Sequence, residues 1–237
     1  MILWCFNVEC QRSFKPKMSR GYVLSGLHLG GEVTIGGTCG LAGAVSPNTG
    51  IPLIQHAKLT LGGKINLDDN WPLPEINFLY SWTCNIFEAD FTYQYKDGSI
   101  KILEYGHGGG PDDDFPYQNY PVFFPPIEFD LKQVTDYEQS VIDKLNSPGC
   151  GVDYKFKDEI TKKLSTPAHH FGGSPFLVDA DNSSKICVSC GNNMPLVATI
   201  GNQSFSNENG FFGNDYAQIV YFACKICLTV SALNRSS

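Results

Sequence analysis

Basic residues are few in this sequence, and they are scattered along it. Lys and Arg together number 17 against 24 Asp and Glu, which gives a formal net charge of −7. A protein that binds DNA or RNA needs several Lys or Arg side chains facing the phosphates together. The composition therefore argues against nucleic acid as a partner, and we expect the surplus carboxylates to form a solvated surface.

Long apolar runs are also lacking. No segment approaches the ~18 uninterrupted apolar residues that a membrane-spanning helix needs, because Gly, Asp or Asn interrupts every candidate. The N-terminal stretch MILWCFNVEC carries no basic segment and no small-residue cleavage site. We therefore expect no signal peptide, no membrane partner and a cytoplasmic location.

Complete catalytic motifs are missing as well. His107-Gly108-Gly109-Gly110 resembles the glycine loop whose amides form an oxyanion hole in some esterases, but the GxSxG sequence around a nucleophile is absent. Asp112 to Asp114 lacks the spacing of an EF-hand calcium loop. We therefore do not expect an enzyme or an ion-binding loop of these classes.

One catalytic alternative nevertheless stays open. His107, Asp112 to Asp114 and His170 could line a cleft that binds a small molecule or performs an unrecognised reaction. General acid–base chemistry requires such groups to come within hydrogen-bond reach of one reacting atom. The alternative therefore depends on whether the fold brings them together.

Glycine, proline and aromatic residues are plentiful, and they indicate short strands joined by turns. The chain has 24 Gly, 14 Pro and 13% aromatic residues, and its 237 residues are enough to bury a sizeable core. Asp97-Gly98 between two runs of strand character predicts a hairpin over 90–105. The aromatic and β-branched run AQIVYFAC at 217–224 predicts a further strand.

Helical patterns are limited to two stretches. Apolar residues fall near helical spacing in LKQVTDYEQSVIDKLN at 131–146, and FKDEITKKL at 156–164 is a second candidate. Strand patterns outnumber them. We predict an α+β fold that is dominated by β structure and has few helices.

Two stretches of the sequence resemble each other and suggest an internal duplication. Residues 58–79 and 168–197 each place an apolar residue before Gly-Gly and then reach an apolar strand start. We therefore predict four consecutive segments. They are an N-terminal segment at 1–57 packed on the first half, a first β-rich repeat with a Pro-aromatic crossover at 58–126, a helical connection at 127–165, and a second β-rich repeat at 166–237.

Four of the nine cysteines form two CxxC pairs, Cys187 with Cys190 and Cys224 with Cys227. An odd cysteine count favours reduced thiols, because a secreted protein usually pairs all its cysteines. Two CxxC turns supply the four sulfurs that tetrahedral zinc prefers. We predict one structural zinc ion per chain in the second half. Disulfides and a thiol redox couple are the alternatives, and the redox couple requires a CxxC at the start of a helix.

Three further cysteines carry an irregular pattern. Cys5, Cys10 and Cys39, with His28, could form another metal site. We favour the alternative that they are buried or free thiols, because the spacing is irregular and cysteine is among the most buried residue types.

The stretch PDDDFPYQNYPVFFPP at 111–126 can continue neither a helix nor a central strand, because proline lacks the amide hydrogen. Its aromatic side chains are candidates for a partner-binding surface, since they supply contact area at low entropic cost. The candidates are Phe115, Tyr117, Tyr120, Phe123 and Phe124. Packing between the two halves is the competing interpretation.

Several of these motifs together resemble the YwqG-like family of bacterial proteins. In the second half they are Gly172-Gly173-Ser174-Pro175, the cysteine segment from Cys187 to Gly191 followed by Met194-Pro195-Leu196, and the strand that ends in Cys224 to Cys227. In the first half, Gly62-Gly63 and Trp71-Pro72 resemble the other copy of the same unit. The resemblance covers residues 58–233.

That family is similar to the programmed cell death protein 2 group, whose members are implicated as chaperones of a ribosomal protein, and some bacterial relatives resemble immunity proteins. The resemblance implies a duplicated, β-rich, intracellular binding protein without known catalysis. Together with the cysteine pattern it leads us to expect a non-enzymatic, zinc-containing protein-binding module of a chaperone-like or immunity type. Its expected partner is another protein.

Overall fold

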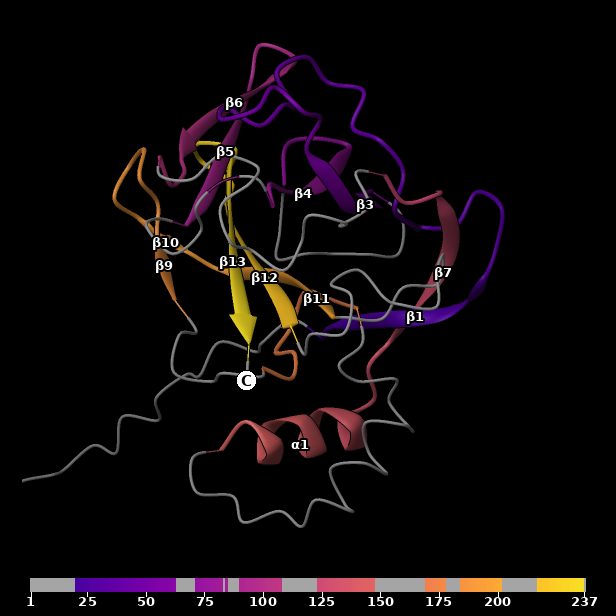
Figure 1. The fold of residues 1–237 in the computed structure, drawn as a ribbon. Helices are drawn as coiled ribbons and strands as arrows, with labels where there is room; N and C mark the ends of the chain where they lie inside the picture. Colours follow the sequence, from indigo (N-terminus) through magenta and orange to yellow (C-terminus); the bar gives the residue numbers. More distant parts are fainter. Residues whose placement is uncertain are drawn as a thin grey trace, which may run out of the picture.

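The computed structural model describes residues 20–62, 71–82, 84, 90–107, 123–147, 169–177, 184–201 and 217–236. Within these residues the chain forms strands and one helix (Figure 1). The strands are β1 (Tyr22–Leu27), β2 (Val33–Ile35), β3 (Ile54–Thr60), β4 (Glu75–Tyr80), β5 (Phe91–Lys96), β6 (Ser99–Glu104), β7 (Ile127–Gln133), β8 (His170–Phe171), β9 (Lys185–Ile186), β10 (Asn193–Met194), β11 (Leu196–Gly201), β12 (Ala217–Cys224) and β13 (Thr229–Ser236). The helix is α1 (Asp136–Leu145). The predicted dominance of β structure is confirmed.

The predicted hairpin at 90–105 is present as β5 and β6. Its two central residues, Asp97 and Gly98, both have positive φ, 50° and 73°. This conformation matches the right-handed twist of the flanking strands, which is why Asp-Gly favours the turn. The strand predicted at 217–224 is also confirmed, as β12.

One antiparallel sheet joins nearly all the strands, in the order β4-β3-β2-β7-β1-β8-β11-β12-β13-β5-β6. Strands from the two predicted β-rich segments pair directly, because β13 pairs with β5 through Val230 and Tyr93. The short strands β9 and β10 form a separate two-stranded sheet. The division of the chain at 57, 126 and 165, and the duplication behind it, remain predictions.

The large sheet folds over a single main core. Phe78 of β4 lies against Tyr221 of β12 and Phe171 of β8, with ring centroids 5.0 and 5.9 Å apart. All three side chains are fully buried. Strands that are far apart in the order of the sheet therefore share one set of aromatic contacts.

Strand β12 separates this core from a second, smaller one. Ile219 and Tyr221 point into the main core, whereas Val220, Phe222 and Cys224 belong to the small one. The division follows from the alternation of side chains along a strand. The small core also contains Cys187 and Met194, so it underlies both cysteine pairs.

The predicted helix is shorter at its start than the sequence pattern indicates. Leu131 to Gln133 belong to β7, and the helix begins only after Thr135. Thr135 and Glu138 form a capping box, in which each side chain accepts a hydrogen bond from the backbone N–H of the other residue. The prediction that 131–133 are helical is wrong, because pairing with β1 and this cap place the boundary later. Residues 156–164 lie outside the described part of the chain.

Helix α1 holds the segment that follows β8. Gln139 donates a side-chain hydrogen bond to the carbonyl of Ser174, at 2.8 Å. Asn146 donates to the carbonyl of Pro175, also at 2.8 Å, and accepts from the backbone N–H of Leu177. These contacts fix the chain just after Gly172 and Gly173.

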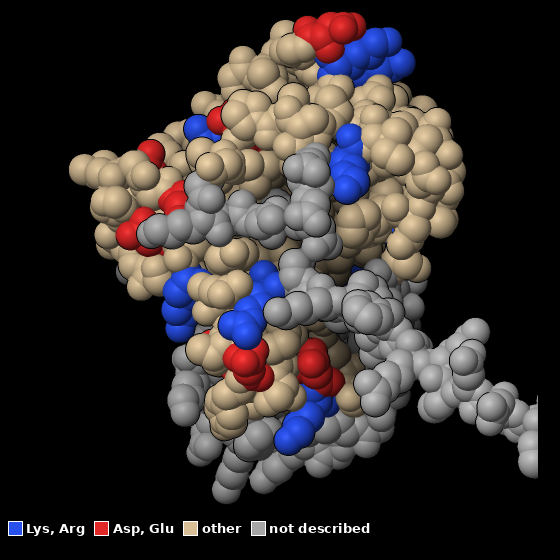
Figure 2. Space-filling model, turned by 180° about the vertical axis from the view of Figure 1, so that it is seen from behind, with Lys and Arg blue, Asp and Glu red and all other residues tan. Residues whose placement is uncertain are grey.

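No helix in the described residues is both long and apolar enough to cross a bilayer. On the face shown in Figure 2, the described basic side chains are interspersed with acidic ones. Ion pairs among the described residues include Arg20 with Asp136 and Lys132 with Glu138. Exposed pairs of this kind contribute little to stability.

Candidate metal centre

The first cysteine loop lies between β9 and β10. The backbone N–H of Cys187 donates to the carbonyl of Asn192, and the N–H of Gly191 donates to the carbonyl of Cys187, both at 2.8 Å. Gly191 has a φ of 73°, a conformation that glycine adopts without strain. The tight turn brings Cys187 and Cys190 to the same side of the loop.

The second cysteine loop joins β12 to β13. Cys224 is the last residue of β12, and Leu228 completes the turn with a φ of 54°. Gln94 of β5 donates a hydrogen bond to the carbonyl of Cys227, at 2.8 Å. Gln94 is 133 positions from Cys227 in the sequence, so no local pattern indicates its role.

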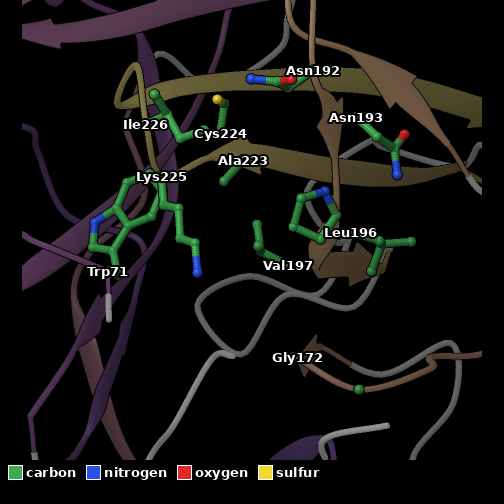
Figure 3. Close-up of a pocket in the computed structure, with 12 residues that line it drawn as sticks. Trp71, Gly172, Asn192, Asn193, Leu196, Val197, Ala223, Cys224, Lys225 and Ile226 are labelled. Atoms are coloured by element: carbon green, nitrogen blue, oxygen red, sulfur yellow. The ribbon is translucent and has the colours of Figure 1, made fainter. Parts of the chain in front are cut away.

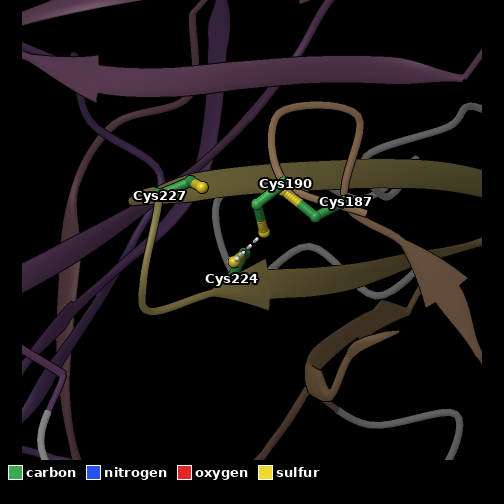
Figure 4. A group of neighbouring side chains, drawn as sticks. All are labelled: Cys187, Cys190, Cys224 and Cys227. Carbon is green, nitrogen blue, oxygen red and sulfur yellow. Dashed lines mark hydrogen bonds between the residues drawn. The ribbon is translucent and has the colours of Figure 1, made fainter. Parts of the chain in front are cut away.

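The four cysteine sulfurs converge on one point, as Figure 4 shows. All four lie within 4.8 Å of one another, and the sulfurs of Cys190 and Cys224 are 3.7 Å apart. Four sulfurs at the corners of a tetrahedron, each about 2.3 Å from a central zinc ion, would be separated by about 3.8 Å. The separations of the sulfurs are therefore compatible with one metal ion bound by all four.

Hydrogen bonds at the cysteine cluster shift the pKa values of its thiols. The backbone N–H of Asn192, with the neighbouring thiols, lowers the pKa of Cys190 to about 7. The thiol of Cys227 hydrogen-bonds to Cys190, and this contact raises the pKa of Cys227 to about 12. One thiolate therefore forms readily near neutral pH, whereas four adjacent thiolates require a cation between them.

The geometry does not favour the two other interpretations of the CxxC pairs. The cysteines are not disulfide-bonded, and 3.7 Å between sulfurs is far beyond the ~2.05 Å of a disulfide. Neither pair begins a helix, because Cys187 follows β9 and Cys224 ends β12. The helix dipole that activates redox thiols is absent at both places.

Of the residues proposed for a His/Asp cleft, the structure describes only His107 and His170. His107 is exposed at the surface, whereas His170 is only 2% exposed within β8. Burial lowers the pKa of His170 to about 4, so its ring is neutral at physiological pH. Asp112 to Asp114 lie outside the described residues.

The aromatic candidates of the 111–126 stretch that can be described differ in their exposure to solvent. Phe123 is 46% exposed, whereas Phe124 is 1% exposed and packs in the main core. The burial of Phe124 agrees with the packing interpretation, whereas Phe123 is accessible to a partner at the surface. Phe115, Tyr117 and Tyr120 lie outside the described residues.

Cys39 and His28, the described members of the third cysteine group, do not form a second metal site among the described residues. Within them, the four CxxC cysteines are the only group of three or more potential ligands that could hold a metal. Cys39 is half-buried, and this burial raises its pKa. His28 instead contacts Asp130, with 2.8 Å between Nδ1 and Oδ1. Cys5 and Cys10 lie outside the described residues.

Comparisons of the chain with known proteins found no match. No protein-family model matches the chain, no curated protein matches its sequence, and no solved structure matches its fold.

Proposed function

We propose that the four cysteines bind one structural zinc ion and that the chain is a zinc-stabilised, non-enzymatic module that binds another protein. The observation that carries the zinc proposal is the convergence of Cys187, Cys190, Cys224 and Cys227 within 4.8 Å. Thiolates select zinc among the common divalent ions, because softer ligands suit it. Four protein ligands fill its coordination shell and leave no position for water or substrate.

A zinc ion here would connect two parts of the fold that also share the small core. Cys187 and Cys190 belong to the small β9–β10 sheet, and Cys224 and Cys227 belong to the large sheet. Binding free energy at such sites becomes folding free energy, because the unfolded chain holds no preformed site. The ion thus has a clear structural role and needs no chemical one.

Apolar side chains on and beside the cysteine loops support protein binding. Ile186, Val188 and Ile226 are 57%, 50% and 70% exposed. A metal-fixed loop presents such side chains without the entropy cost of ordering them on binding. The resemblance to the YwqG-like family and the programmed cell death protein 2 group also favours a chaperone-like or immunity-type binder. Reduced thiols fit a cytoplasmic location.

Elemental analysis of the untagged protein tests the metal. We expect zinc close to one ion per chain, and its loss from a Cys190→Ser and Cys224→Ser double variant. Cys39→Ser is the matched control, because Cys39 lies outside the cluster. Zinc absent from the wild type, or retained fully by the double variant, would contradict the proposal.

Capture experiments test the binding role. Zinc-loaded wild type and a Val188→Ser and Ile226→Ser variant are compared as bait. A partner that the wild type retains and the variant releases, at equal zinc content, supports the loops as the contact surface. Equal capture by both baits would remove that surface.

A further inference from the structure

The four cysteines of the candidate metal centre differ in their exposure to solvent. Cys187 and Cys224 are 1% and 3% exposed, and Cys227 is partly buried. Cys190 is the one member of the cluster that is exposed at the surface. Oxidation of a cysteine depends on the access of the oxidant to the sulfur and on the thiolate character of that sulfur. Zinc binds cysteines as thiolates, so an oxidant in the solvent would react with this cluster first at Cys190.

A second sulfur lies beside the exposed one. The side chain of Cys190 points toward Cys224, which ends β12 (Figure 4), and the two sulfurs are 3.7 Å apart. A disulfide has an S–S length of about 2.05 Å, so the two sulfurs would have to approach each other by about 1.7 Å. Cys190 therefore has a partner thiol for a disulfide, and this thiol belongs to the other cysteine loop.

Contacts besides the sulfurs keep the two cysteine loops together. The small core packs beneath both of them. Ser189 Oγ also lies 3.5 Å from Oγ1 of Thr229, the first residue of β13. Loss of the metal would therefore leave Cys190 and Cys224 as neighbours. Such proximity favours a reaction within the chain over a reaction between separate chains.

A cavity beside the second cysteine loop leaves room for a small movement. Cys224, Lys225 and Ile226 line this cavity of about 250 Å³, together with Trp71 from the segment before β4 (Figure 3). A close-packed interior resists displacement, whereas a loop at the edge of a cavity meets fewer atoms when it shifts. The second loop is therefore able to follow its sulfur toward Cys190.

Two exposed apolar side chains would move with the sulfurs. Val188 lies between the first pair of cysteines, and Ile226 lies between the second pair. They are 50% and 70% exposed. Each belongs to a turn whose two ends carry cluster sulfurs, so a change in the sulfur positions changes the surface that the loops present.

We propose that hydrogen peroxide oxidises Cys190, that a disulfide then forms between Cys190 and Cys224, and that zinc is released. Oxidation would thereby switch the cysteine loops from a zinc-held to a disulfide-held arrangement and alter their exposed surface. This regulation rests on the proposed function, because it acts on the same zinc site. It differs from a redox couple within one CxxC pair, because the disulfide joins the two pairs.

The chemistry proceeds in two balanced steps. The thiolate of Cys190 attacks one peroxide oxygen, so that an S–O bond forms, the O–O bond breaks, and the departing hydroxide takes up a proton and becomes water. The thiolate of Cys224 then attacks this sulfur, so that the S–S bond forms, the S–O bond breaks, and a second water leaves after protonation. The sulfurs lose two electrons, and the peroxide oxygens gain them. Cys187 and Cys227 alone cannot fill the four-ligand shell of structural zinc, so the ion leaves with its charge unchanged.

Zinc release from the zinc-loaded full chain tests the first consequence. The protein is treated with hydrogen peroxide, and a chromogenic chelator records zinc in solution, with an untreated sample as the reference. We expect release of nearly all the bound zinc, and rebinding after reduction with dithiothreitol. Zinc content is measured before oxidation, so the two proposals can fail separately. Absence of zinc at that stage would contradict the proposed function, whereas bound zinc that peroxide does not release would contradict its regulation alone.

Peptide mapping under non-reducing conditions identifies the disulfide. Digestion with trypsin and a glutamyl endopeptidase yields peptides 186–208, 209–225 and 226–235. The first contains one CxxC pair, and the other two contain Cys224 and Cys227 separately. We expect 186–208 linked to 209–225 after oxidation, with fragmentation placing the bond at the second cysteine of the first pair.

Two histidine variants form a matched pair. Histidine is also a zinc ligand, so Cys190→His and Cys227→His each keep four ligands for the ion. Cys190→His lacks the exposed sulfur and should release zinc at least about tenfold more slowly than the wild type. Cys227→His keeps both reacting sulfurs and should release zinc as the wild type does.

Nuclear magnetic resonance of the oxidised chain follows the surface, and the methyl signals of Val188 and Ile226 should shift. Three further results would overturn the proposal. They are a disulfide that does not join 186–208 to 209–225, equal rates of zinc release from Cys190→His and the wild type, and unchanged methyl signals in the oxidised chain.

Discussion

The sulfur atoms of Cys190 and Cys224 lie 3.7 Å apart, although 34 positions separate the two residues in the sequence. The turn after β9 and the end of β12 each present one of them, and the small core of Met194 and Phe222 packs beneath. The contact therefore joins two backbone segments that also pack together in this small core. Its consequences for stability lead to the first prediction.

Removal of the metal should destabilise the protein. If zinc binds only the folded state, free zinc at about 1,000 times its Kd adds roughly 4 kcal/mol to the free energy of unfolding. Chemical denaturation with and without a chelator measures this difference. The Cys190→Ser and Cys224→Ser variant should unfold like the chelated wild type, and should not respond to the chelator. A wild type that is equally stable in both conditions would contradict the structural role.

Acidification should destabilise the protein through two buried histidines. Burial lowers the pKa of His56 to about 3 and that of His170 to about 4. The unfolded chain takes up these protons below about pH 6.5, whereas the folded chain does so only near the lowered values. The free energy of unfolding should therefore be highest above about pH 6.5 and fall by roughly 1.4 kcal/mol per pH unit for each histidine below it.

Denaturant unfolding at about pH 7 and about pH 5 measures this slope. His56→Gln should make the slope shallower. Tyr221→Phe is the matched control, since it removes the hydroxyl that lies 2.8 Å from His56 Nδ1 but keeps the titrating ring. Equal slopes for wild type and His56→Gln would show that His56 does not carry the effect.

Two adjacent phenylalanines should respond differently to truncation. Phe124 is 1% exposed, and Phe124→Ala should reduce the free energy of unfolding by about 3 to 5 kcal/mol through the cavity it leaves. Phe123 is 46% exposed, so Phe123→Ala should change it by less than about 0.5 kcal/mol. Thermal and chemical unfolding measure both. Loss of partner capture by Phe123→Ala at wild-type stability would assign Phe123 to the partner surface.

Glycines with positive φ should differ in their tolerance of alanine. Gly98→Ala should cost about 1 kcal/mol, because φ is 73° but nothing lies within 4 Å of the added Cβ. Gly173→Ala should cost roughly 2 to 4 kcal/mol, because its Cβ would also lie 2.3 Å from the backbone nitrogen of Gly21. Gly40→Ala, where the Cβ meets open space, is the control. Equal losses at Gly98 and Gly173 would contradict the close approach of the two backbones.

Local patterns identified the features that depend on neighbouring residues. Asp97-Gly98 determines its own turn, and the alternating run at 217–224 is a strand in the structure. Each CxxC turn is likewise a local feature. The predicted start of the helix is wrong, because Leu131 fits both helical spacing and a strand, and pairing with β1 decides between them.

The sequence by itself determined the dominance of β structure, the hairpin and the identity of the four cysteines as one candidate centre. Only the tertiary structure decided that β13 pairs with β5, that Phe124 is buried beside an exposed Phe123, and that Trp71 and Lys225 line the same pocket. Turns and alternation depend on the few residues around them. Pairing and burial depend on which distant segments exclude water together, and that choice is made by the whole chain.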